Sequence, residues 1–181
     1  MTWEVAHALL LAGAAHNLLR DLQLELAQFF DTDRNLSLPP HITMKAPFST
    51  DDVGRHKAYL DRLGAETREI QLRLTRIELF ADRTLYLGVD QAPALPPLGA
   101  RIQKDLAPEA RPSMYEATQT VRHHATIGRV RTDQLGPAGE VVGRTYGLPT
   151  RITEIALLLR QSPGEWFVAR TAPLRSGVRS R

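Results

Sequence analysis

The pattern of apolar and polar residues along the first quarter of the chain predicts a strand, a helix and a second strand. Residues 4–12 form a nearly continuous apolar run, which is typical of a fully buried strand. Leu and Phe residues then recur at helical spacing over 18–30, with acidic residues on the other side. A loop rich in Asp, Asn, Ser and Pro leads into a strand at about 41–46. Ser49 or Thr50 can cap the helix that follows.

The rest of the chain continues as a mixture of alternating strands and short helices. Apolar and polar positions alternate over 69–80, which predicts a half-buried strand. The later elements, in order, are its hairpin partner at 84–90, a helix at 96–106, an irregular loop at 107–120, a strand at 121–130, a helix from 132, and a closing hairpin of 151–160 with 165–171. This order predicts an α+β fold with mainly antiparallel pairing.

Length indicates one domain, and the charge does not indicate a surface for duplex DNA. A chain of 181 residues suits one domain, which we expect over 1–172, followed by a disordered basic tail at 173–181. The last ten residues hold three Arg and no acid, so the body carries 20 basic (23 − 3) and 20 acidic residues. A neutral body argues against a broad surface for duplex DNA and leaves open a local pocket for a small anion.

Cysteine usage and hydropathy bear on chemistry and compartment. The chain has no Cys, which excludes disulfides, thiolate nucleophiles and Cys-ligated metals, and fits a reducing cytosol. The apolar N-terminal stretch follows Glu4 and contains His7, with no basic residue before Arg20, so it does not resemble an export signal. No apolar run approaches the ~20 residues of a membrane span. We expect a cytoplasmic protein, with a monomer favoured.

A His-x-Thr tripeptide occurs twice in matching contexts. The segments "HITMKAPFSTDD" and "HATIGRVRTDQ" each run from a strand into a Thr-Asp helix cap. They begin at His41 and at His124, 83 residues apart (124 − 41). Such an internal repeat of strand, cap and helix predicts a two-lobed fold with an approximate twofold axis.

The spacing within each tripeptide predicts an acid–base site for phosphate chemistry. Residues i and i+2 of a strand share a face, so His41 lies with Thr43 and His124 with Thr126. If the two faces meet at one cleft, two imidazoles can serve as general acid and general base near neutral pH. Threonine hydroxyls can bond the non-bridging phosphate oxygens between them. This chemistry needs no metal or other cofactor.

Other residues near the motifs are candidates for weaker roles. Lys45 and Arg122 have the strand parity to reach the same anion, whereas strict alternation places Arg129 on the opposite face. Arg129 joins the site if the strand is bulged or ends by Gly128, or if it reaches the phosphate from the rim. Tyr115, on the long loop before the second motif, is a candidate for stacking on a nucleobase.

The remaining histidines are expected to be structural. His123 points away from the face of its neighbour in the motif, and His7, His16 and His56 have no Thr partner two residues on.

The paired motifs resemble those of the two-histidine phosphoesterase superfamily, and within it the LigT-like 2′-5′ RNA ligases or RNA 2′,3′-cyclic phosphodiesterases. "PHITMKAPF" resembles the first motif block of that family and "HHATIGR" the second, with Arg129 matching the usual arginine. The resemblance implies a bilobal fold with two antiparallel sheets around a central cleft. It also implies hydrolysis of 2′,3′-cyclic phosphates on RNA ends or small nucleotides, with His41 as acid and His124 as base.

The sequence departs from that family at one position and leaves alternatives open. LigT-like first motifs commonly carry an aromatic residue five positions after the histidine, where this chain has Ala46, with Phe48 two further on. The same chemistry run backwards would join RNA ends through a 2′-5′ linkage. A non-catalytic module that binds RNA terminal phosphates is the alternative from another class.

Overall fold

A computed structural model of the chain describes residues 2–30, 36–90, 92–110, 122–161 and 163–177. The elements are, in chain order, β1 (Trp3–Leu10), α1 (Gly13–Glu25), the 3₁₀ turn η1 (Ala27–Phe29), β2 (His41–Thr50), α2 (Val53–Glu66), β3 (Ile70–Leu79), β4 (Thr84–Asp90), α3 (Leu95–Leu106), β5 (His124–Arg129), the 3₁₀ turn η3 (Thr132–Gln134), α5 (Leu135–Gly139), β6 (Thr145–Ile152), β7 (Glu154–Arg160) and β8 (Phe167–Pro173). The α+β class is therefore as expected.

The strands form one antiparallel sheet where we expected two. Its order is β6-β3-β4-β5-β2-β1-β7-β8, so β5 and β2 join two four-stranded halves at the centre. That central contact is a single residue pair, Ile42 with Ala125. The two motifs are thus neighbours in one sheet and not opposite walls between two sheets.

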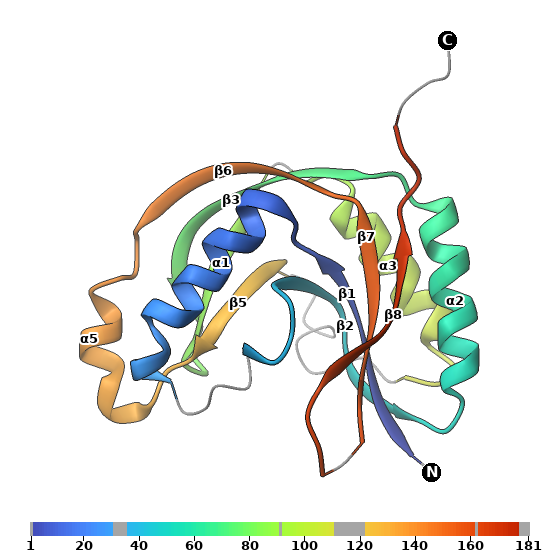
Figure 1. The fold of residues 1–181 in the computed structure, drawn as a ribbon, viewed down its shortest axis with the longest axis horizontal. Coiled ribbons are helices and arrows are strands. Elements are labelled where there is room, and N and C mark those ends of the chain that lie inside the picture. Colours follow the sequence, from blue (N-terminus) through green and yellow to red (C-terminus); the bar gives the residue numbers. More distant parts are fainter. Residues whose placement is uncertain (1, 31–35, 91, 111–121, 162, 178–181) are drawn as a thin grey trace.

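The two halves are built alike and are held together by helices that cross the centre. The run β1–α1–β2 in one half corresponds to β4–α3–β5 in the other, so each motif begins the last strand of such a run. Helix α1 contacts β5 and β6, and α3 contacts β2, so each helix packs on the half opposite to its own strands. Figure 1 shows β3 and β6 arching over the molecule, with α2 beside β8 at one end.

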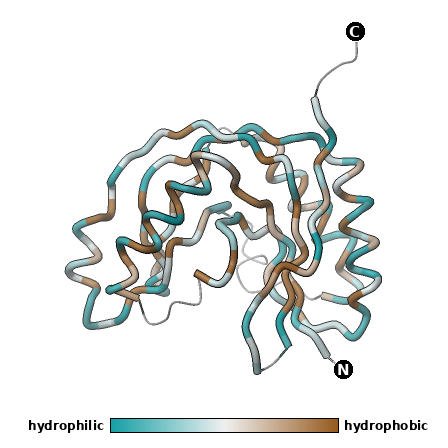
Figure 2. The backbone as a smooth tube through the Cα atoms, viewed as in Figure 1, coloured by the Kyte–Doolittle hydropathy of each residue, from teal (hydrophilic) through white to brown (hydrophobic). Residues whose placement is uncertain are grey.

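The core lies between the sheet and the helices. The central strands bury side chains there, such as Ile42 on β2 and Ile127 on β5, both fully buried. Helices contribute the facing layer, for example Leu19 of α1 and Ile102 of α3. Figure 2 shows the hydropathy of each residue along the backbone, with hydrophobic residues on the central strands and hydrophilic residues on the outer sides of the helices. No helix in the described ranges is long and apolar enough to cross a membrane.

Some element boundaries differ from the expectation. Strand β6 was missed, because its sequence "TYGLPTRI" contains Gly and Pro and lacks clean alternation. Helix α2 is capped by Asp52, whose carboxylate accepts the Arg55 N–H at 2.9 Å, and not by Ser49 or Thr50. Pro173 ends β8, and the buried Leu174 belongs to the core. Residues 178–181 of the expected tail lie outside the described residues.

Helix α2 approaches β8 so closely that one position requires glycine. A Cβ atom built on Gly64 would lie 2.8 Å from the Pro173 carbonyl oxygen and 2.9 Å from Ala172 Cβ. The first neighbour is backbone in a paired strand, which cannot turn aside as a flexible side chain would. Gly54, in the first turn of the same helix, is exposed, and its Cβ would meet nothing closer than 3.4 Å.

We predict that Gly64→Ala lowers the free energy of unfolding by about 1–3 kcal/mol, the usual cost of overpacking, although alanine favours helix. Gly54→Ala should leave stability unchanged or raise it by up to about 1 kcal/mol through helix propensity. Urea unfolding of the two variants measures the difference. Equal stability of both would show that α2 does not depend on close contact with β8.

Candidate active site

The register at the centre of the sheet places the two motifs diagonally. Ile42 pairs with Ala125 in antiparallel register. One step to either side, His41 therefore neighbours Thr126, and Thr43 neighbours His124. The two histidines occupy diagonal positions, which lie roughly 7–8 Å apart in an antiparallel pair. All four side chains are partly exposed, whereas Ile42 and Ala125 between them are fully buried.

Both histidines are held by the same backbone contact. Nδ1 of His41 lies 2.8 Å from the carbonyl oxygen of Pro39, and Nδ1 of His124 lies 2.8 Å from that of Arg122. A carbonyl oxygen can only accept a hydrogen bond, so Nδ1 must carry a proton in each ring. Nε2 of each ring is therefore the nitrogen that can accept or donate a proton to a substrate.

The surroundings lower the pKa of both histidines. Burial is the main cause of the lowered pKa of His41. The hydrogen bond to Pro39 raises this pKa, and the charge on His124 lowers it. Burial also dominates for His124, against a hydrogen bond to Arg122 and the negative charge of Asp82, both of which raise its pKa. In the free protein at neutral pH, both rings are mainly neutral.

An aromatic and charged cluster surrounds His124. The Phe80 ring stacks on the Tyr86 ring with centroids 4.0 Å apart, and both meet His124 edge-on at 4.9 and 5.1 Å. Glu78 accepts hydrogen bonds from the Tyr86 hydroxyl at 3.1 Å and from Arg122 at 2.9 Å. These contacts exclude water from one side of the imidazole, which explains the dominant effect of burial on its pKa.

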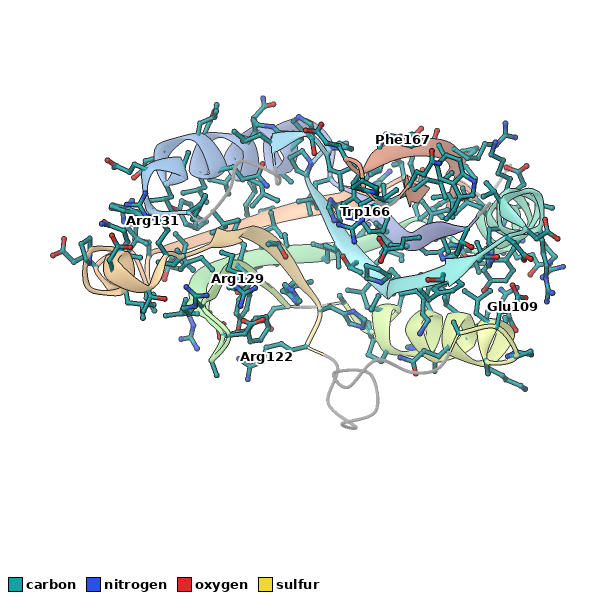
Figure 3. All side chains as sticks on the ribbon, turned by 90° about the horizontal axis from the view of Figure 1, so that it is seen from below. Glu109, Arg122, Arg129, Arg131, Trp166 and Phe167 are labelled. Carbon is teal, nitrogen blue, oxygen red and sulfur yellow. The ribbon has the colours of Figure 1, made fainter. Side chains whose placement is uncertain are left out.

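A pocket of about 260 Å³ opens beside the other motif. It is lined by three motif side chains, His41, Thr43 and Thr126, and extends over β1 and β7 to Trp166 just before β8. Figure 3 shows Trp166 well apart from Arg122 and Arg129 near β5. One end of the site is therefore a pocket that reaches Trp166, and the other end is the aromatic and charged cluster around His124.

Helix α1 supplies two positioning residues that the sequence pattern did not reveal. Arg20 donates to the carbonyl oxygens of Leu36 and Leu38 at 3.2 and 2.7 Å, which holds the segment leading into His41. Gln23, one turn later, donates from Nε2 to the Thr126 carbonyl oxygen at 3.2 Å. One helix face thus fixes both motifs. All three acceptors are backbone carbonyl groups, which no side chain in the sequence reveals.

Arg129 lies on the same face as the motif side chains because β5 is bulged. Leu85 pairs with Gly128, but Tyr86 pairs with Thr126, so β5 has one extra residue at this point. Thr84 then pairs with Arg129, and Thr84 shares a face with Tyr86. Of the three arrangements considered for Arg129, the structure has the bulge.

A second bulge moves Lys45 away from the site. Ala8 pairs with Thr43, but His7 pairs with Lys45, so β2 carries the extra residue here. Lys45 is 2% exposed and points to the opposite face, with Nζ 5.9 Å from the centroid of the Phe48 ring. The expectation that Lys45 shares the face of Thr43 was wrong, because strict alternation fails at a bulge.

Arg122 precedes β5 and stays near His124 through its bonds to Glu78 and Tyr86. Its side chain is 62% exposed. The neighbouring His123 packs near Gly99 of α3, away from the motif face. Tyr115 lies outside the described residues. No group of three or more His, Asp or Glu side chains is arranged to hold a metal ion in the part of the chain that the structure describes.

Behind the site, the core holds a buried pair of histidines. His7 and His56 are fully buried with ring centroids 5.8 Å apart, and both ring nitrogens of His7 lack a hydrogen-bond partner among the described residues. Burial, the charge on His56 and the charge on Lys45 lower the pKa of His7 to about 3. His7 is therefore neutral in the folded protein and binds a proton at mildly acidic pH only when the chain unfolds.

We predict that His7 makes the protein sensitive to acid. Its pKa rises from about 3 to 6.5 on unfolding. The contribution of neutral His7 to the free energy of unfolding is therefore fully present above pH 6.5 and is lost as the pH drops toward 3. His7 contributes about 1.4 kcal/mol per pH unit to this slope below pH 6. His7→Phe should therefore make the acid limb less steep in urea unfolding between pH 7 and about 4.5, while His41 and His124, whose pKa values burial also lowers, still contribute to it. The control His16→Phe, at a partly exposed position on α1, should retain the limb, and an unchanged slope in His7→Phe would contradict the assignment.

The sequence of the chain matches a known protein family. The profile of the 2′-5′ RNA ligase superfamily matches residues 12–164. The chain belongs to this superfamily. It is 25% identical over 140 residues to a predicted phosphoesterase of Geobacillus sp. (strain WCH70), covering 74% of this chain and 78% of the relative. A similar protein from Bacillus cereus (strain G9842) is 28% identical over 150 residues, covering 77% and 81% of the two chains.

Solved structures of other proteins share the fold. A protein of Thermus thermophilus superposes with a TM-score of 0.71 at 18% identity, covering 97% of this chain and 100% of its own. Escherichia coli LigT in complex with 3′-AMP gives a TM-score of 0.65 at 15% identity, covering 96% and 99%. The recognition of a LigT-like, two-histidine phosphoesterase fold from the paired motifs is confirmed.

Proposed function

We propose that this protein is a metal-independent phosphodiesterase that hydrolyses 2′,3′-cyclic phosphates on RNA ends or small nucleotides to 2′-phosphates. The observation that carries the proposal is the matched pair of histidines, each with Nδ1 on a backbone carbonyl, which leaves Nε2 as the nitrogen for proton transfer. Two such groups on one face, diagonal to each other and flanked by two threonines, suit in-line displacement at a phosphorus atom between them.

In the reaction, a water oxygen attacks phosphorus and the bond from phosphorus to the ribose O3′ breaks. His124 accepts the water proton at Nε2, and His41 donates a proton from Nε2 to O3′. Thr43 and Thr126 donate hydrogen bonds to the non-bridging oxygens, and Arg129 adds positive charge from the same face. The product is a 2′-phosphate with a free 3′-hydroxyl. With the 5′-hydroxyl of a second RNA in place of water, the same displacement would give a 2′-5′ linkage and a free 3′-hydroxyl.

The electrostatics of the pair support this division of roles. The negative charge of Asp82 raises the pKa of His124, which makes it a stronger base than burial alone would allow. A positive charge on His124 lowers the pKa of His41. As His124 takes the proton from water, His41 therefore becomes a stronger acid toward the leaving oxygen.

Ligands of structural relatives support a nucleotide substrate. Escherichia coli LigT has been crystallised with 3′-AMP, ATP, NADP⁺ and phosphate. A site that accepts nucleotides and phosphate alike is in keeping with a cyclic nucleotide substrate for this chain.

We predict that His41→Ala and His124→Ala each lower kcat/KM for 2′,3′-cyclic AMP by about 10²–10⁴-fold, the usual contribution of a general acid or base. Thr43→Val and Thr126→Val should cost about 10–100-fold, as expected for lost hydrogen bonds to a charged group. Assays contain EDTA, and unfolding of each variant is measured as a control. Wild-type activity in the His41/His124 double variant would overturn the proposal, and binding of the cyclic nucleotide without any turnover would favour a phosphate-binding module.

We also predict an acidic optimum. Because burial lowers the pKa of both histidines, the kcat/KM profile should be bell-shaped, with its maximum below the ordinary histidine value of 6.5. Above the maximum the acid has lost its proton, and below it the base is already protonated. Asp82→Asn removes the charge that raises the pKa of His124, so one limb should move to lower pH. An optimum above pH 7, unmoved in Asp82→Asn, would contradict this.

A further inference from the structure

We propose that the pocket ending at Trp166 binds the base of the nucleotide that carries the cyclic phosphate. This inference rests on the proposed function and adds the part of the substrate that the motifs do not explain. The pocket is continuous with the reacting groups, since His41, Thr43 and Thr126 form one end of it and Trp166 the other. A ligand whose phosphate lies between the motifs must extend either into this pocket or toward Arg122.

The floor of the pocket is apolar. Ala6 of β1 and Leu158 of β7, which pair with each other, line it together with Leu38 and Pro47. Ala6, Leu38 and Leu158 belong to a small buried cluster with Ala8 and Ala156, separate from the main core, against which Trp166 packs. The small side chain of Ala6 keeps the floor low, so a flat ring can lie over it beside the phosphate.

Trp166 packs against Arg160, whose positive charge is paired with Glu4. The Arg160 guanidinium carbon lies 5.0 Å from the centroid of the indole ring. Arg160 itself is bound to Glu4, with Nε 2.6 Å and Nη2 2.5 Å from the same carboxylate oxygen. The indole is thereby fixed, and the charge of Arg160, which also lines the pocket, is paired with Glu4. This end of the pocket favours an uncharged aromatic group over a second phosphate.

The opposite direction offers a different surface. Beyond His124, the face of β3 and β4 has a larger, polar hollow of about 530 Å³, with Arg76, Glu78, Asp90 and Arg122 in its lining. Charged groups of both signs suit the sugar–phosphate chain of an RNA more than a base. The apolar floor and the indole therefore select the Trp166 side for the base. The volume there, below the ~300–1,000 Å³ of drug-sized sites, suits one nucleoside.

Stacking on an indole does not distinguish strongly among bases, because every base has a π-face. We therefore expect the pocket to accept purines and pyrimidines alike and to discriminate against substrates that lack a base. Base–aromatic stacking is worth about 1–3 kcal/mol, which corresponds to roughly 5–150-fold in kcat/KM.

The kinetic test compares 2′,3′-cyclic AMP with methyl riboside 2′,3′-cyclic phosphate, which has the same reacting group and no base. Trp166→Ala should lower kcat/KM by about 5–150-fold for the nucleotide and leave the base-free substrate unchanged, while Trp166→Phe should retain most of the preference. Phe167→Ala is the matched control. Phe167 is the next residue, 46% exposed, and its ring meets Trp3 at 6.2 Å (Figure 3).

A binding test does not depend on turnover. The chain has two tryptophans, so in a Trp3→Phe background Trp166 is the one indole. Adenosine 2′-phosphate should quench its fluorescence, whereas inorganic phosphate and ribose phosphate should not. Equal loss of activity on both substrates in Trp166→Ala, or equal quenching by inorganic phosphate, would overturn the base subsite and leave the proposed reaction standing. Quenching by the nucleotide without turnover of either substrate by the wild type would overturn the reaction and support the subsite.

Discussion

The pairing of Ile42 with Ala125 determines where everything else in the site lies. Both residues are fully buried, and they join the two halves of the sheet through one antiparallel contact. That contact brings two segments from different parts of the chain together in fixed register. It sets each histidine beside the threonine of the other motif. The site is therefore a property of the junction and not of either half alone.

The helices make so small a junction sufficient. Because α1 packs on β5 and β6 while α3 packs on β2, separating the halves would expose core residues on both sides. Arg20 and Gln23 add polar contacts from α1 to each motif segment. Hydrophobic burial supplies most of the cohesion, and the two polar side chains supply the alignment.

Sequence periodicity predicted the central part of the site and failed at identifiable places. The i, i+2 spacing correctly placed His41 with Thr43 and His124 with Thr126, because neither bulge falls inside a motif. Both bulges fall just after the motifs, and they reversed the expected faces of Lys45 and Arg129. A bulge depends on pairing with another strand, so one strand's sequence cannot reveal it. Trp166 was not predicted for a related reason. It directly precedes β8, and only the order of strands in the sheet places β8 on the same side of the sheet centre as the strand that carries His41.

The backbone bonds of the two histidines have a consequence for how this protein can change through evolution. Pro39 and Arg122 fix the ring nitrogens through carbonyl oxygens, which every amino acid possesses. Side chains at these two positions can drift without disturbing the tautomer that the proposed proton transfer requires. Selection on the proposed reacting centre would then act on few side chains, while the flanking residues would remain free to adapt the protein to a new substrate.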